Sequence, residues 1–165
     1  MHGFVTSKHS LAALLLALIS VAIPLAIRGA SGPANASAAP WRASQIITPA
    51  EMAREIALPK DKRPVMICVG FEALYRGGHV PGALYKGPAR DASGVEQLRA
   101  WSRSIPKDTR VVIYCGCCPF VRCPNVRPAF EALRAEGLMH VQVLDIEDTF
   151  VKDWTQKGYP TEKGQ

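Results

Sequence analysis

Three short apolar runs mark the centre and the C-terminal part of the chain. They are residues 65–69 (VMICV), 110–114 (RVVIY) and 141–144 (VQVL). Each run is four or five residues long and rich in β-branched residues. Such runs are typical of strands that are buried on both faces of a sheet. We therefore expect three buried strands.

Helix signals lie between and around these runs. Thr48 can act as an N-cap, Pro49 suits the first helical position, and Glu51 can complete a capping box. Residues 93–96 (SGVE) repeat the capping-box pattern and precede a helix with one apolar face, formed by Val95, Leu98 and Trp101. Asn125 can cap a further helix, whose inward face includes Phe130 and Leu133 and whose end is marked by Gly137.

A last short helix is expected around residues 150–154, before Gly158. Strands that alternate with helices of this length predict an α/β domain, in which helices cover both faces of a parallel sheet. Ligands of such sheets bind at the carboxyl ends of the strands.

The N-terminal segment resembles a secretion signal. Residues 11–23 (LAALLLALISVAI) form an unbroken apolar run after Lys8, and residues 34–36 (ANA) offer a small-x-small cleavage site. We expect residues 1–36 to be a signal peptide or, if uncleaved, a membrane anchor. Either outcome exports the rest of the chain, to the periplasm or the outer face of the cytoplasmic membrane.

Composition adds limits on domains and partners. Residues 37–46 are expected to be a linker, and residues 47–162 a single domain, in a chain of 165 residues. The net charge of +6 comes from scattered Lys and Arg residues. This charge is too small to predict nucleic-acid binding, and it suits small anions. A membrane is an expected partner only if the N-terminal segment remains.

Cys115 stands where the expected sheet would bind a ligand. It follows the strand at residues 110–114 directly, and a loop beginning with Gly116 leads to the helix start at Asn125. A strand end, a glycine-containing loop and a helix N-terminus provide backbone N–H groups, which favour an anion and lower the pKa of a thiol. Cys115 is therefore predicted to be a nucleophile, with Gly116 and Asn125 helping to bind an anion.

Three motifs in this order resemble the rhodanese family of sulfurtransferases. They are residues 78–83 (GHVPGA), 111–115 (VVIYC) and the ending 153–160, which contains W-x-x-x-G-x-P. The likeness covers roughly residues 47–160. It implies a three-layer α/β domain around a central parallel five-stranded sheet, with a persulfide on the cysteine after the fourth strand. It implies no metal and no organic cofactor.

Two features depart from that family. Residues 68–70 (CVG) stand where the family usually has Asp-x-Arg, so a buried ion pair is missing. The loop is also unusual, because six residues separate Cys115 from Arg122 whereas four separate Cys117 from Arg122. Cys117 is therefore an alternative nucleophile. Arg122 could either hold an anion or be a solvated side chain.

The loop is also rich in thiols. Cys115, Cys117, Cys118 and Cys123 fall within nine residues. In an exported protein, disulfides among them are expected at least transiently. A neighbouring thiolate can attack the inner sulfur of a persulfide, and Cys118 or Cys123 is the expected resolving thiol. A structural disulfide between those two remains the alternative.

Other function classes compete with sulfur transfer. The spacing of Cys115, Cys118 and Cys123 also suits zinc, copper or an iron-sulfur cluster, although Cys68 would have to supply any distant ligand. A thiol-disulfide redox protein is a further alternative. His79 is expected to bond locally, Arg127 to lie at the surface and Cys68 to lie in the core. We expect an exported enzyme that moves sulfur from a small anion such as thiosulfate to a thiol acceptor or reductant protein.

Overall fold

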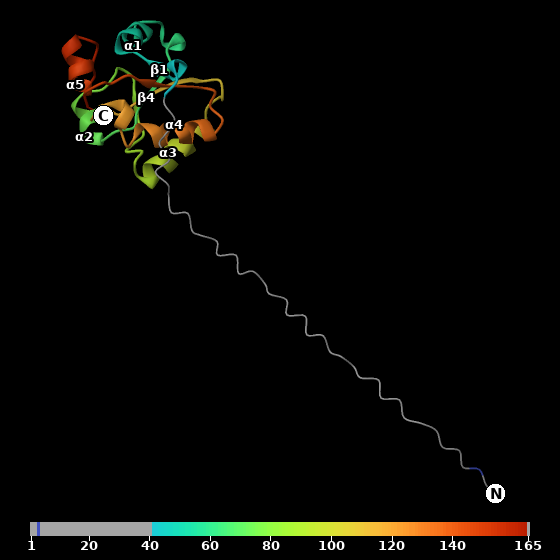
Figure 1. Cartoon of the computed structure of the whole chain (residues 1–165). Coiled ribbons are helices and arrows are strands. Elements are labelled where there is room, and N and C mark those ends of the chain that lie inside the picture. Colours follow the sequence, from blue (N-terminus) through green and yellow to red (C-terminus); the bar gives the residue numbers. More distant parts are fainter. Residues whose placement is uncertain (1–2, 4–40, 165) are drawn as a thin grey trace. The chain divides into compact units, whose positions relative to one another are not determined.

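The computed structural model describes Gly3 and residues 41–164, and the described residues form one parallel sheet between helices (Figure 1). Its strand order is β1-β5-β4-β2-β3, with β4 in the centre, and all four pairings are parallel. The α/β class and the five-stranded parallel sheet are therefore confirmed. The strands are β1 (Ile46–Ile47), β2 (Val65–Cys68), β3 (Leu84–Tyr85), β4 (Arg110–Tyr114) and β5 (His140–Leu144).

Helices cover both faces of this sheet (Figure 1). Residues of β4 alternate between two cores: Val111 and Ile113 pack with α3 and α4, and Val112 and Tyr114 pack with α1 and α5. This alternation follows from the two-residue period of a strand. The helices are α1 (Pro49–Ile56), α2 (Glu72–Gly77), α3 (Ala92–Arg103), α4 (Val126–Ala135) and α5 (Phe150–Asp153).

The two predicted capping boxes have different outcomes. Before α1, the Glu51 N–H donates to Thr48 Oγ1 (3.2 Å) and the Thr48 N–H donates to Glu51 Oε2 (2.9 Å), so this capping box is confirmed. The second prediction is wrong, because α3 already begins at Ala92. The Val95 N–H bonds to the Asp91 carbonyl (3.1 Å), which places Ser93 inside the helix.

The folded domain begins before residue 47. Trp41 packs edge-on against Phe130, with 5.0 Å between ring centroids, and the Arg127 guanidinium lies 3.7 Å from the centroid of the Trp41 ring. Ile46 pairs with Val143 in the sheet. Residues 41–46, assigned to a linker from the sequence, are thus part of the domain.

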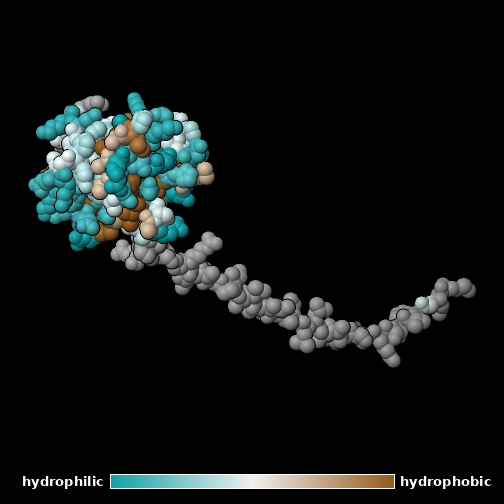
Figure 2. Space-filling view, turned by 90° about the horizontal axis from the view of Figure 1, so that it is seen from above, coloured by the Kyte–Doolittle hydropathy of each residue, from teal (hydrophilic) through white to brown (hydrophobic). Residues whose placement is uncertain are grey.

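The predicted signal segment, residues 1–36, lies outside the described residues except for Gly3. Within the described part, no helix is long and apolar enough to cross a membrane. The surface of the domain is mostly hydrophilic on the face seen in Figure 2, with small separate apolar areas. The large apolar side chains exposed on the domain include Leu58, Leu74, Leu84, Val121, Met139 and Val151.

Candidate active site: the cysteine loop after β4

Cys115 is the first residue after the central strand β4, and its side chain is 3% exposed. Gly70, just after β2, lies against it. A Cβ on Gly70 would sit 2.6 Å from the Cys115 carbonyl oxygen and 2.8 Å from Cys115 Sγ. Gly70 ends the CVG segment at residues 68–70. The absence of a side chain at Gly70 lets the ends of β2 and β4 approach each other, a role that no local sequence pattern indicates.

Asn125 holds Cys115 from the other side. It occupies the N-cap position of α4 and is fully buried, yet its side chain does not cap the helix as predicted. Instead, Asn125 Nδ2 donates to Cys115 Sγ (3.3 Å), and Asn125 Oδ1 accepts from the Arg90 N–H (2.9 Å). The Asn125 amide therefore fixes the position of Cys115.

The sulfur atoms of the loop lie close together. Cys117 Sγ is 3.1 Å from both Cys115 Sγ and Cys118 Sγ. The sulfurs of Cys115, Cys117 and Cys123 all lie within 4.8 Å of one another. All five cysteines of the chain are free thiols in this structure.

Backbone N–H groups at the start of α4 bind Cys123 rather than Cys115. A hydrogen bond from the Cys115 thiol, followed by bonds from the N–H groups of Asn125 and Val126, lowers the pKa of Cys123 to about 5, against the effect of burial. The hydrogen bond to Cys123 and burial raise the pKa of Cys115. The helix N-terminus that was expected to favour a thiolate at Cys115 therefore donates its N–H groups to the neighbouring sulfur of Cys123.

The other two thiols with altered acidity are governed by burial. Burial, helped by the hydrogen bond to Cys117, raises the pKa of Cys118 to about 12. Burial also raises the pKa of Cys68 to about 11. Cys68 is a core residue, as predicted, and its Sγ lies 4.0 Å from the Cys115 carbonyl oxygen.

The other two residues predicted to bind an anion, Gly116 and Arg122, lie in different parts of the loop. Gly116 has φ +82°, and its carbonyl accepts the Phe150 N–H (3.0 Å), which ties the loop to α5. Arg122 has an exposed side chain in the 3-10 turn Phe120–Arg122. The Phe120 and Arg122 N–H groups already bond to the carbonyls of Ile146 and Pro119. The loop backbone therefore offers fewer free N–H groups than the sequence predicted.

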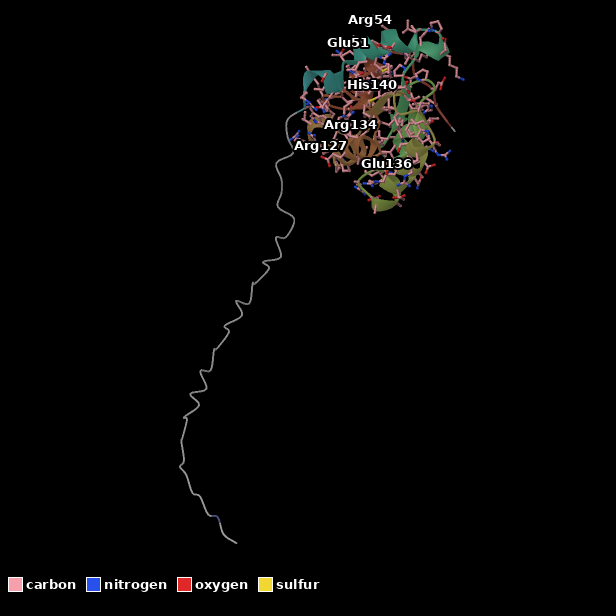
Figure 3. The ribbon with its side chains drawn as sticks, turned by 90° about the vertical axis from the view of Figure 1, so that its right-hand side faces the viewer. Glu51, Arg54, Arg127, Arg134, Glu136 and His140 are labelled. Atoms are coloured by element: carbon pink, nitrogen blue, oxygen red, sulfur yellow. The ribbon has the colours of Figure 1, made fainter. Side chains whose placement is uncertain are left out.

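A cavity of about 290 Å³ opens beside Cys115. Apolar side chains of α2 and α5 line it, with Lys163 contributing the positive charge. A larger cavity of about 650 Å³ lies at the opposite ends of β4 and β5, beside Arg110, Arg134 and His140; the last two are labelled in Figure 3. No cysteine lines this larger cavity, so the thiol chemistry belongs to the first one.

His79 and Arg127 were both predicted to have no part in the chemistry. His79 is buried and stacked on Tyr75, and its Nδ1 is 2.8 Å from the Tyr75 carbonyl oxygen. This agrees with a local role. Arg127, labelled in Figure 3, is half-buried against Trp41 instead of being a free surface residue.

Comparison with solved structures shows a rhodanese-like fold. The rhodanese-like domain of the Alr3790 protein from Anabaena sp. matches with a TM-score of 0.51 and 20% identity, over 72% of this chain and 79% of that chain. The single-domain sulfurtransferase RDL2 of Saccharomyces cerevisiae matches with a TM-score of 0.52 and 17% identity, over 72% of this chain and 94% of that chain. Thiosulfate sulfurtransferase from Pseudomonas aeruginosa matches with a TM-score of 0.51 and 22% identity, over 73% of this chain and 19% of that chain. Neither family models nor curated protein sequences give a match.

Proposed function

We propose that this rhodanese-like domain is a sulfurtransferase that carries sulfane sulfur as a persulfide on Cys115. One observation carries the proposal: Cys115 follows the central strand of the sheet, and a buried Asn125 amide points at its sulfur (3.3 Å). Ligands of parallel sheets bind at this end of the strands. Solved proteins of the same fold that are named sulfurtransferases support the reaction class.

The proposed reaction uses two sulfur-sulfur exchanges. Cys115 attacks the outer sulfur of a donor such as thiosulfate, and its proton passes to the hydrogen-bonded Cys123 sulfur. A Cys115–sulfur bond forms, the bond within thiosulfate breaks, and sulfite leaves with the electron pair. An acceptor thiolate then attacks the outer sulfur of the persulfide and leaves Cys115 as a thiolate.

Neighbouring thiols give this persulfide a second fate. A thiolate that attacks its inner sulfur forms a disulfide with Cys115 and expels sulfide. Of the two resolving thiols predicted from the sequence, Cys123 lies within 4.8 Å of Cys115, whereas Cys118 contacts Cys117. We therefore assign resolution to Cys123. A thiol acceptor or a reductant protein is then required to restart the cycle.

The test is the intact mass of the reduced, metal-free chain after exposure to thiosulfate. Wild-type protein and the Cys68→Ala control should gain one sulfur atom at early times, because Cys68 lies outside the loop cluster, and should then lose that sulfur and two hydrogens as Cys123 resolves the persulfide to a disulfide. Cys115→Ser should gain none and should keep the circular dichroism of the folded protein. If Cys117→Ser fails to gain sulfur while Cys115→Ser gains it, the nucleophile is Cys117.

We also propose that the domain acts after export, as residues 1–36 suggest. A reporter enzyme that is active only outside the cytoplasm, fused after Gln165, should be active when the whole chain is present and inactive when residues 1–36 are deleted. Full-length protein found only in the cytoplasmic fraction would refute export and leave the sulfur-transfer proposal standing.

A further inference from the structure

Three sulfur atoms of the loop converge on one point. The Sγ atoms of Cys115, Cys117 and Cys123 lie within 4.8 Å of one another, although seven residues separate the first from the last. In the part of the chain that the structure describes, no other three His, Cys, Asp or Glu side chains converge in this way. Sulfur transfer through a single persulfide needs one thiol and at most one resolving thiol, so a third converging sulfur has no role in it.

The spacing of these sulfurs suits one metal ion. A thiolate binds a borderline or soft metal at about 2.3 Å, so sulfurs that share an ion lie about 4 Å apart. The three sulfurs reach this spacing with small shifts: Cys115 Sγ and Cys117 Sγ, 3.1 Å apart, must separate slightly, and no pair is more than 4.8 Å apart. The set contains no carboxylate and no imidazole, and such all-thiolate sets select soft ions.

The number of available thiolate ligands favours monovalent copper over zinc at this site. Structural zinc takes four protein ligands, whereas monovalent copper is satisfied by two or three thiolates. The fourth sulfur of the loop, on Cys118, lies 3.1 Å from Cys117 and falls outside the converging set. Cys115 and Cys123 are 3% and 4% exposed, so water has little access as a fourth ligand.

The surroundings compensate the negative charge of the sulfurs. The Asn125 amide donates to Cys115, and the N–H groups of Asn125 and Val126 donate to Cys123. These donors come from the beginning of α4, where the helix dipole also favours negative charge. Three thiolates carry more negative charge than one monovalent ion neutralises, so a site of this kind needs hydrogen-bond donors to its sulfurs.

We propose that Cys115, Cys117 and Cys123 form a binding site for monovalent copper. Each thiol that binds releases its proton, and no electron is transferred. The site stands on the sulfur geometry and does not depend on sulfur transfer. Because both roles use Cys115, copper-loaded protein cannot carry a persulfide there, and the loop alternates between the two states.

The first test is an anaerobic titration of the reduced full-length protein with Cu(I) in the presence of a competing chelator. We expect one copper per chain. Cys115→Ser, Cys117→Ser and Cys123→Ser should each weaken binding by more than about 100-fold, because second-shell changes alone cost about 10–100-fold. Cys68→Ala should bind copper within about threefold of wild type, since its sulfur does not belong to the converging set. Cys118→Ser should lose affinity, because its sulfur contacts Cys117, but less than any of the three ligand variants.

X-ray absorption of the loaded protein then counts the ligands, and three sulfurs are expected. A count of two sulfur ligands would refute the proposed three-cysteine site. So would a Cys118→Ser variant that loses as much copper affinity as Cys117→Ser. Circular dichroism confirms that each variant is folded. Sulfur loading from thiosulfate is measured separately on metal-free protein: if copper fails to bind while the one-sulfur mass gain persists, only the copper site is refuted.

Discussion

At the scale of single residues, Gly70 determines whether Cys115 can occupy its place. In Gly70→Ala the new methyl group would meet the Cys115 carbonyl oxygen and Sγ at 2.6 and 2.8 Å, and the oxygen belongs to backbone that cannot easily move. We expect a loss of about 1–3 kcal/mol in the free energy of unfolding, as for overpacked cores. Sulfur loading, followed by mass, should fall by at least about tenfold, because a displaced reacting atom has a large effect on rate.

Gly77→Ala is the matched control for this change. Gly77 ends α2, and a Cβ there would meet nothing within 4 Å. The variant should be at least as stable as wild type, since alanine favours helix. Unchanged loading by Gly70→Ala would mean that the contact with Cys115 is relaxed without consequence.

Asp145 gives a pH dependence of stability. Burial, followed by the charges of Glu147 and Asp153, raises the pKa of Asp145, and its Oδ1 is buried without a hydrogen-bond partner among the described residues. A raised pKa means that the folded state binds the proton more tightly than the unfolded state. This contribution to the free energy of unfolding is therefore favourable at low pH and is lost as pH rises through the raised pKa.

Asp145→Asn removes this titration while keeping the shape of the side chain. We expect the variant to be more stable than wild type at neutral pH, with a difference that shrinks as pH falls toward the ordinary aspartate pKa of about 4. Urea unfolding across this range measures the difference. Asp61→Asn, at a highly exposed site, should show no such trend. A difference that is independent of pH would contradict the assigned cause.

Residue roles in the loop were only partly predictable from the sequence. The position of Cys115 after a buried strand was readable, because an apolar β-branched run ends there. The lowered pKa of Cys123 could not be predicted, because it depends on which sulfur faces the N–H groups of Asn125 and Val126. Asn125 illustrates the same limit: an asparagine at a helix start predicts a cap, and only the packing shows that its amide turns toward Cys115.

At the scale of elements, Gly116 joins the loop to α5. Its φ of +82° is unfavourable for other residues, and a Cβ there would sit 2.8 Å from Phe150 Cβ. Gly116→Ala should therefore lower the free energy of unfolding by about 2–5 kcal/mol, combining left-handed strain of about 1–2 kcal/mol with overpacking of about 1–3 kcal/mol. Gly158→Ala is the control, since it has φ +77° and no atom within 4 Å of its Cβ.

Chemical denaturation of both glycine variants separates the two terms. The control should lose only the strain term, about 1–2 kcal/mol. Equal losses in the two variants would show that Phe150 moves aside, and that the contact between the loop and α5 does not fix the position of Gly116.

Elements were predictable where a local pattern was long enough. Strands β2, β4 and β5 span four or five residues and matched the predicted apolar runs. Strands β1 and β3 have two residues each, which is too short for a periodic signal. The start of α3 was misplaced because a Ser-x-x-Glu pattern can also occur inside a helix, and the sequence does not show that Asp91 accepts the first bond.

At the scale of the whole domain, the residues before the sheet help to hold the cysteine loop. Trp41 contacts Phe130 on α4 and Phe120 in the 3-10 turn, with ring centroids 5.0 and 6.1 Å apart, and Arg127 lies over its ring. The Gly, Ala, Ser and Pro residues preceding Trp41 have linker composition, and the sequence does not show which rings Trp41 contacts. These ring contacts link Trp41 to the middle of the loop and to the helix that follows it.

Trp41→Ala tests how far the domain extends toward the N-terminus. The substitution removes the ring contacts with Phe120 and Phe130, so we expect a loss of about 2 kcal/mol in the free energy of unfolding, roughly half the value for a fully buried tryptophan. Val121→Ala, in the same loop but 62% exposed, should change stability by less than about 0.5 kcal/mol. Urea unfolding of both full-length variants measures the effect. If Trp41→Ala is as stable as the Val121 variant, the cooperative domain begins at residue 47, and the packing of Trp41 contributes nothing to its stability.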